Sequence, residues 1–153
     1  MDTHKQMVDD IIKTVKLFHH FTPDQAEKIL SGCQKVKLSV GDILIEEDSE
    51  GEEFYLLLAG SLKVITKKGD VCFANIRPIT VVGEIAMLLH QPRSATVKAE
   101  KDCHLLRLSR EDLQPFFKDD LAMELQLYRN LCEVLSEKLL QTNLIIKKYS
   151  EKE

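Results

Sequence analysis

The most informative segment of this chain is Gly83-Glu84-Ile85-Ala86-Met87-Leu88-Leu89-His90-Gln91-Pro92-Arg93-Ser94-Ala95-Thr96. It links one expected strand to the next through a short helical turn. Glycine lets the backbone approach a ligand closely, and the first N–H groups of a short helix starting at Glu84 attract an anion. Arg93 can return to the same place with a two-pronged guanidinium, and Ser94 can add a hydroxyl donor. The segment therefore predicts a binding site for a phosphodiester.

The carboxylate of Glu84 indicates what else the ligand carries. A buried carboxylate beside a bound anion is unfavourable unless it accepts a hydrogen bond from the ligand itself. Glu84 fits this role if the ligand presents a ribose 2′-hydroxyl. The alternative is that Glu84 and Arg93 form an ordinary surface ion pair.

A β region surrounds this segment. From Val36 onward the apolar residues alternate or form short runs, and glycines at turn-like positions separate these runs. We expect strands at residues 36–39, 43–46, 54–58, 62–66, 71–76, 80–82, 95–99 and 103–108. Short strands at such spacing favour a closed roll, a mainly β fold of the jelly-roll or double-stranded β-helix type.

Two helices are expected before the β region. Apolar residues recur at the helical period over residues 3–18, and Thr3 and Gln6 are placed as a capping box. The stretch Thr22-Pro23-Asp24-Gln25 repeats this signal with proline at the first helical position, and Gly32 ends the second helix. The first helix should pack one face against the body.

The β region is followed by two expected helices. Ser109 and Asp112 open the first as a capping box, and it should break near Pro115. The second is uninterrupted over residues 120–149, about 45 Å at 1.5 Å per residue. Its apolar stripe has the 4-3-4-3 spacing of a two-stranded coiled coil. This seam consists of Leu121, Leu125, Tyr128, Cys132, Leu135, Leu139, Thr142, Ile146 and Tyr149, and it favours a parallel homodimer over a lone core helix.

Length and composition limit the class of protein. The 153 residues are 44% hydrophobic and 30% charged, which suits one domain over residues 1–153. Its parts are N-terminal helices (1–32), a β-roll (36–108) that includes the segment 83–96, and C-terminal helices (109–153). The net charge of −4 argues against direct nucleic-acid binding. Without an apolar stretch of about 18 residues or a signal peptide, we expect a cytoplasmic protein that does not enter a membrane.

Neither the acidic run nor the cysteines indicate a metal. Seven carboxylates lie in residues 42–53, and a solvated loop is favoured over a cation site because the order of calcium-loop ligands is missing. The cysteines, Cys33, Cys72, Cys103 and Cys132, are widely spread without a Cys-x-x-Cys pair. We expect reduced thiols, mostly in the core.

The pattern G-E-x-A-x5-P-R-S-A-T in residues 83–96 resembles the phosphate-binding cassette of cyclic-nucleotide-binding domains. That family includes the bacterial catabolite activator and the regulatory subunits of protein kinase A, and this chain resembles a stand-alone, bacterial-like member. Further matches lie at Gly41–Leu44 and Phe54–Leu62, so the resemblance extends over about residues 15–145. Agreement at this many fixed positions favours ligand binding over a surface ion pair.

The resemblance implies roles for individual residues. It places Glu84 on the ribose 2′-hydroxyl and Arg93 on the cyclic phosphate, with Ser94 and the cassette backbone completing the phosphate cradle. Thr142-Asn143 looks like the pair that contacts adenine in the catabolite activator, the second residue acting across the dimer. Thr142 as a plain seam residue is the open alternative. The expected ligand-binding residues are Gly83, Glu84, Ile85, Ala86, Arg93, Ser94, Ala95, Thr142 and Asn143.

This sequence departs from the family pattern at three positions. Glu47 replaces a glycine of the first loop, and Ile79 replaces one shortly before the cassette. His90 stands where the family commonly has glycine. These differences affect loop conformation more than the chemistry of the ligand.

We therefore expect a regulatory sensor that binds cyclic AMP, or alternatively cyclic GMP, and signals through its C-terminal helix to an effector protein not identified by the sequence. Its chain ends at Glu153 without a DNA-binding segment, so output should pass to a partner or through the dimer. No cofactor, metal or enzymatic activity is expected, because a cupin-type enzyme needs clustered histidines. The rival hypothesis is a protein-interaction β-roll that has lost or changed its ligand.

Overall fold

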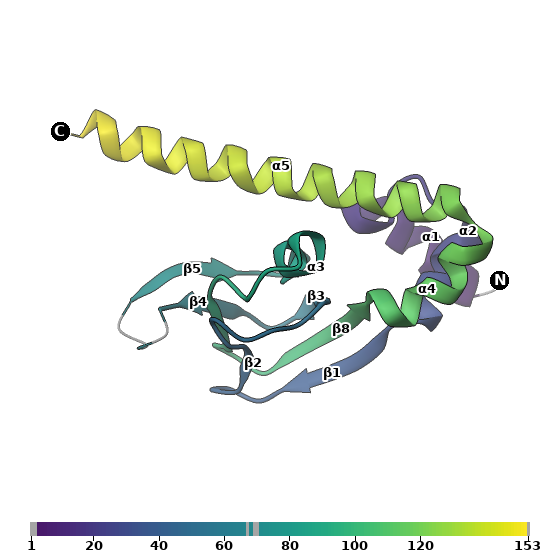
Figure 1. Cartoon of the computed structure of the whole chain (residues 1–153), viewed down its shortest axis with the longest axis horizontal. Helices are drawn as coiled ribbons and strands as arrows, with labels where there is room; N and C mark the ends of the chain where they lie inside the picture. The colour runs from purple at the N-terminus through teal and green to yellow at the C-terminus, as the bar shows by residue number, and fades with distance from the viewer. Residues whose placement is uncertain (1–2, 67, 69–70, 153) are drawn as a thin grey trace. The chain divides into compact units, whose positions relative to one another are not determined.

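The computed structural model describes residues 3–66, 68 and 71–152 (Figure 1). The chain divides into two compact units. One runs from Ile29 to Phe116, and the other combines Met1–Lys28 with Phe117–Glu153. The first unit contains strands β1 to β8 and the cassette helix α3 (Glu84–Leu89), and the second contains helices from both ends of the chain.

Two four-stranded antiparallel sheets form the roll. One has the order β1-β8-β3-β6, built from Gln34–Leu38, Cys103–Ser109, Glu53–Ala59 and Thr80–Val82. The other has the order β2-β7-β4-β5, built from Ile43–Ile45, Thr96–Ala99, Leu62–Ile65 and Cys72–Ile76. The mainly β prediction is confirmed, and each expected strand is found with ends displaced by at most two residues.

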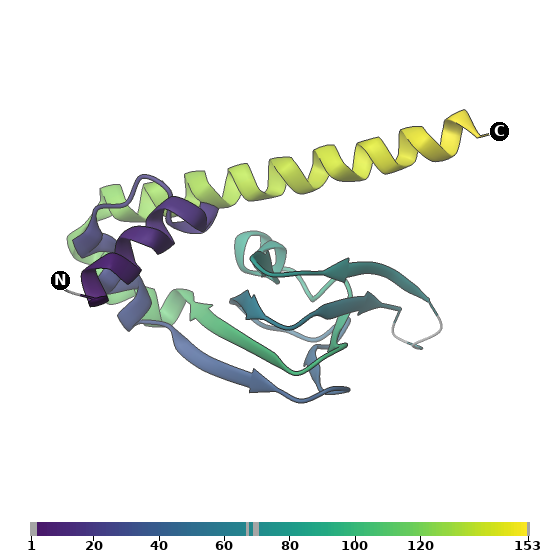
Figure 2. The ribbon, with the colours of Figure 1, turned by 180° about the vertical axis from the view of Figure 1, so that it is seen from behind.

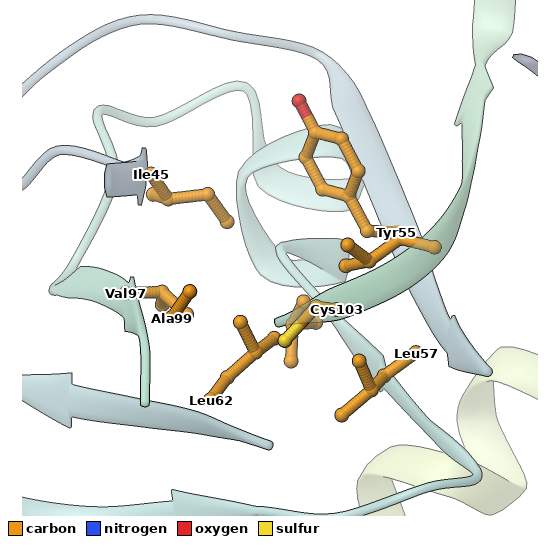
Figure 3. Close-up of a cluster of buried hydrophobic side chains, with 9 residues drawn as sticks. Ile45, Tyr55, Leu57, Leu62, Val97, Ala99 and Cys103 are labelled. Atoms are coloured by element: carbon orange, nitrogen blue, oxygen red, sulfur yellow. The ribbon is translucent and has the colours of Figure 1, made fainter. Parts of the chain in front are cut away.

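The core of the roll receives side chains from both sheets. Figure 3 shows Tyr55, Leu57 and Cys103 of the first sheet gathered with Ile45, Leu62, Val97 and Ala99 of the second. Successive side chains of a strand point to opposite faces, so only alternate residues enter this core. Each large apolar side chain that is fully buried contributes roughly 1.5–3 kcal/mol. Burial also raises the pKa of the Cys103 thiol, which therefore behaves as a small apolar residue.

The prediction that most cysteines are buried is wrong for two of them. All four thiols are free, and Cys72 and Cys132 are exposed. Cys72 begins β5, a strand at the edge of its sheet, and Cys132 lies on the exposed face of the last helix. Cys33 is largely covered, and its burial together with the charge of Asp112 raises the pKa of the thiol to about 12.

The N-terminal helices differ in one respect from the sequence prediction. Helix α1 (Thr3–Thr14) ends four residues early, and the 3-10 turn η1 (Lys16–Phe18) follows an extended Val15. The Thr14 hydroxyl donates to the carbonyl of Asp10, and such side-chain bonds compete with regular helix geometry. Helix α2 (Pro23–Ser31) has the predicted capping box, because Thr22 and Gln25 exchange side-chain to backbone hydrogen bonds.

Helix α4 (Arg110–Asp119) continues through Pro115, so the predicted break there is wrong. Proline removes one backbone donor, but Leu113 before it and Phe117 after it are both buried. Burial of these apolar side chains offsets the lost hydrogen bond. The predicted cap at the start of α4 is present, since the Ser109 hydroxyl accepts from the backbone N–H of Asp112.

Helix α5 spans Leu121–Glu151, and its N-cap is Asp120, whose carboxylate accepts from the N–H of Met123. Figure 2 shows α1 beside the first turns of α5. Asn130 on α5 is fully buried and donates to the carbonyls of Leu17 and His19, each 2.9 Å away. The other buried residues of α5 are Met123, Leu127 and Leu131.

The predicted coiled-coil seam lies on a different face of α5 from these buried residues. Within the chain its members are exposed, apart from the half-buried Tyr128 and Leu135. Homodimerisation through this seam stays a prediction. Within the described residues, none of the helices combines the length and apolarity needed to cross a bilayer.

Candidate functional site

Gly83 begins the cassette in a conformation that favours glycine. Its φ is +86°, in the left-handed region, and it forms the N-cap of α3. A Cβ added there would lie 2.8 Å from Nη1 of Arg93 and 3.1 Å from Cδ1 of Ile45. Backbone torsion and lack of space both disfavour a larger residue. The group that Gly83 approaches in the structure is the guanidinium of Arg93, and its close approach to a ligand stays a prediction.

Arg93 is a buried cation held by backbone carbonyls. Only 4% of its side chain is exposed. Nη1 donates to the carbonyl of Gly83 at 2.9 Å, and Nη2 donates to that of Glu53 at 2.7 Å. The carboxylate of Glu53 lies 3.5 Å from Nη2. A buried guanidinium is tolerated only with such hydrogen bonds and a counter-ion.

The acidic loop, the part of the acidic run 42–53 that lies between β2 and β3, forms one wall of this site. Arg93 donates its backbone N–H to the carbonyl of Ser49 at 2.8 Å, and its own carbonyl accepts from Asp48 at 2.9 Å. Thr96 is buried, and its hydroxyl accepts from the N–H of Glu47. A Cβ on Gly51 would come within 2.6 Å of Nη2 of Arg93. The loop therefore holds the backbone around Arg93 and covers the guanidinium.

The described residues contain no cluster of three or more His, Cys, Asp or Glu side chains arranged to hold a metal ion. In the acidic loop, the backbone pairs with the cassette.

The structure brings several of the predicted site residues together. Glu84 and Ala86 are buried in α3, with exposures of 2% and 5%. Because Glu84 and Arg93 are both buried, a surface ion pair between them is excluded. Ile85 is exposed, so its side chain points away from the buried face. Ser94 is exposed and Ala95 half-buried, and both lie directly before β7.

The two residues assigned to base recognition belong to the other compact unit. Thr142 and Asn143 lie on α5 and are exposed. The Thr142 hydroxyl donates to the carbonyl of Lys138 in its own helix at 2.9 Å. Their contact with a base therefore stays a prediction.

Sequence reasoning missed the charged residues behind Arg93. Glu53 and Tyr55 of β3 pair in register with Ser109 and Arg107 of β8. Arg107 is two residues after Leu105 in β8, so both lie on the same face of the strand. A charged residue on an apolar strand face was the signal available in the sequence. Tyr55 is buried, and desolvation followed by the charge of Glu53 raises the pKa of its phenol.

His90 ends α3 in place of the family's glycine. Its φ of +53° is left-handed, a region in which histidine is more frequent than most residues. Nδ1 lies 3.3 Å from a carboxylate oxygen of Glu52, and Nε2 lies 3.4 Å from Nη1 of Arg110. These contacts hold a conformation that glycine adopts without help.

Comparison with known protein families gives a match over more than half of this chain. The model of the cyclic nucleotide-binding domain matches residues 35–120. A cAMP-dependent protein kinase regulatory subunit from Aspergillus fumigatus is 30% identical over 107 residues, which cover 70% of this chain and 26% of that protein. The chain thus spans about a quarter of the length of that curated relative.

Solved structures share the fold. A cyclic nucleotide-binding domain from Methylobacillus flagellatus KT matches with a TM-score of 0.81 at 22% identity, over 94% of this chain and 85% of that one. The catabolite activator protein of Thermus thermophilus matches with a TM-score of 0.71 at 27% identity, over 88% of this chain and 63% of that one.

Proposed function

The chain belongs to the cyclic nucleotide-binding domain family, and on that premise we propose that it binds cyclic AMP at the cassette 83–96. The observation that carries this proposal is the buried guanidinium of Arg93, fixed against the carbonyl of Gly83, together with the burial of Glu84 in the same cassette. Arg93 has five N–H groups, and two terminal nitrogens make the hydrogen bonds described above. The remaining donors can serve a cyclic phosphate.

The other cassette residues complete the binding site. Glu84 accepts a hydrogen bond from the ribose 2′-hydroxyl. Ser94 and the backbone of Ile85 and Ala86 donate to the phosphate, and Ala95 stays small to admit the ligand. Thr142 and Asn143 contact the adenine, Asn143 from the partner subunit.

Signalling proceeds through α5. Residues 1–153 act as one regulatory module without catalytic activity, and the seam of α5 forms a parallel homodimer. Exposure of Leu139, Ile146 and Tyr149 within the single chain supports this arrangement, because an apolar stripe of this length is costly in water. Cyclic AMP shifts the helix arrangement by its differential contacts with the two forms, and an effector protein reads the change.

Burial of both Glu84 and Arg93 favours ligand binding over an interaction module that has lost its ligand. A buried charged side chain is costly to retain unless it serves a purpose such as holding a ligand.

Calorimetry and thermal unfolding with cyclic AMP, cyclic GMP and cyclic dinucleotides test the proposal. At about 100 times its Kd, the true ligand should add roughly 2.7 kcal/mol to the free energy of unfolding. Thr142→Ala should reduce the preference for cyclic AMP by about tenfold or less, the value of one hydrogen bond. The 2′-deoxy analogue should bind more weakly than the ribo form. Absence of binding by every cyclic nucleotide would contradict the proposed function.

A further inference from the structure

Glu53 lies between two arginines. Its carboxylate oxygens are 3.5 Å from Nη2 of Arg93 and 4.0 Å from Nη2 of Arg107. The Tyr55 hydroxyl donates to Oε1 at 3.4 Å. Glu53 is half-buried, with 27% of its side chain exposed, so its charge is only partly screened by water.

The position of Arg93 does not depend on this carboxylate. Both terminal nitrogens of its guanidinium are already fixed by carbonyls at shorter distances, and one of these carbonyls belongs to the backbone of Glu53. Replacing the carboxylate by an amide leaves both contacts in place. The side chain of Glu53 therefore contributes negative charge to the phosphate site more than geometry.

Arg107 is itself divided between two carboxylates. Its Nη1 lies 3.7 Å from Oδ2 of Asp112 and donates to Oε1 of Gln34 at 3.3 Å. Oδ2 of Asp112 is buried and makes no hydrogen bond within the described residues. A buried oxygen of this kind depends on the charge of Arg107 for its compensation. Any movement of Arg107 therefore changes the environment of Asp112.

We propose that Glu53 is a counter-ion shared by Arg93 and Arg107. When a phosphate binds Arg93, the carboxylate of Glu53 leaves Arg93 and pairs with Arg107 instead. This inference rests on the proposed function. Two anions at one buried guanidinium repel each other, so the carboxylate weakens phosphate binding. Once displaced, it attracts Arg107 more strongly and draws it from Asp112.

Asp112, the last charged group in this series, lies where it can pass a signal to the rest of the protein. Asp112 lies in the first turn of α4, and its backbone N–H donates to the capping hydroxyl of Ser109. The boundary between the two compact units falls inside the same helix, between Phe116 and Phe117. A changed contact at Asp112 thus acts on the element that connects the phosphate-binding unit to the unit containing α5.

Affinity measurements on Glu53→Gln test the first half of the proposal. By calorimetry, cyclic AMP should bind Glu53→Gln roughly three to ten times more tightly than wild type, since one nearby negative charge is removed. The matched control is Glu50→Gln, which removes the same charge from an exposed position of the loop that precedes β3. Weaker binding by Glu53→Gln would indicate a purely structural role, and a change equal to that of the control would indicate a general charge effect. Either result overturns the proposal.

Nitrogen NMR of the arginine Nε–H groups tests the second half and separates it from the proposed function. The two resonances are assigned by their loss in Arg93→Lys and Arg107→Lys. Without any nucleotide, Glu53→Gln should shift both resonances, and a shift of one or neither overturns the shared counter-ion. In wild type, cyclic AMP should shift the Arg107 resonance, and Glu53→Gln should abolish that response. If wild type binds no cyclic nucleotide, the proposed function fails, while the nucleotide-free comparison still decides whether the two arginines share Glu53.

Discussion

The guanidinium of Arg93 donates to the carbonyl of Gly83 across 2.9 Å, and this contact joins the two ends of the cassette. Ten residues separate the pair in sequence. A cation that closes its own binding loop in this way has two roles, because it both shapes the loop and recognises the ligand. Predictions for the site therefore need to separate stability from affinity.

Arg93→Ala should abolish most cyclic-nucleotide binding and also destabilise the fold. Loss of the charge-assisted phosphate contact is expected to cost about 2–5 kcal/mol of binding. Leaving the Gly83 and Glu53 carbonyls without donors should cost about 1–3 kcal/mol of unfolding free energy. Calorimetry and urea denaturation measure the two effects. Wild-type affinity in a folded Arg93→Ala protein would remove the phosphate assignment.

Gly83→Ala should destabilise the protein more than Gly41→Ala. Both glycines have left-handed φ values, +86° and +92°, so each alanine carries a torsional cost of about 1–2 kcal/mol. At Gly41 the nearest side-chain atom to a new Cβ is 4.0 Å away, whereas at Gly83 Nη1 of Arg93 is 2.8 Å away. Only Gly83→Ala should also weaken cyclic AMP binding. Equal losses of stability, measured by urea denaturation, would show that the Arg93 side chain moves away from the new Cβ without an energetic cost.

Leu139→Asp should dissociate the proposed homodimer. Burying an unpaired carboxylate in an apolar seam opposes association strongly. Ser136→Asp adds the same charge to a neighbouring exposed position outside the seam and should leave the dimer intact. Light scattering at micromolar concentration distinguishes the two variants. A monomeric wild type would contradict the proposed homodimer.

The cap of α5 should make stability depend on acid pH. A hydrogen bond from Gln25, followed by that from the N–H of Met123, lowers the pKa of Asp120 below its ordinary value. Because the pKa of Asp120 is lower in the folded protein than in the unfolded chain, its charged form stabilises the fold at pH values above the ordinary pKa of aspartate. This stabilisation is lost as the pH falls through the lowered pKa. Urea denaturation between about pH 6 and pH 2 should show a flatter profile for Asp120→Ala than for wild type. Parallel profiles would contradict the assignment.

Local patterns in the chain were sufficient to find the cassette, the eight strands and the capping box at Thr22. These features depend on spacing within a few residues, on turn chemistry and on alternation, all of which can be seen in the sequence. Errors occurred where tertiary packing overrides local preference. Pro115 stays inside a helix whose neighbouring apolar residues are buried, and the first helix ends at Thr14.

The partners of the site residues depended on contacts between distant segments. Glu53 reaches Arg93 across 40 residues because the acidic loop and the cassette pair through their backbones. Arg107 reaches Glu53 because β3 and β8 are adjacent in one sheet. A sequence gives the chemistry that each side chain can perform, but burial and strand register arise only when the chain folds. For this reason Arg93 and Glu84 were recognisable from their motif, whereas the carboxylate that neutralises Arg93 was not.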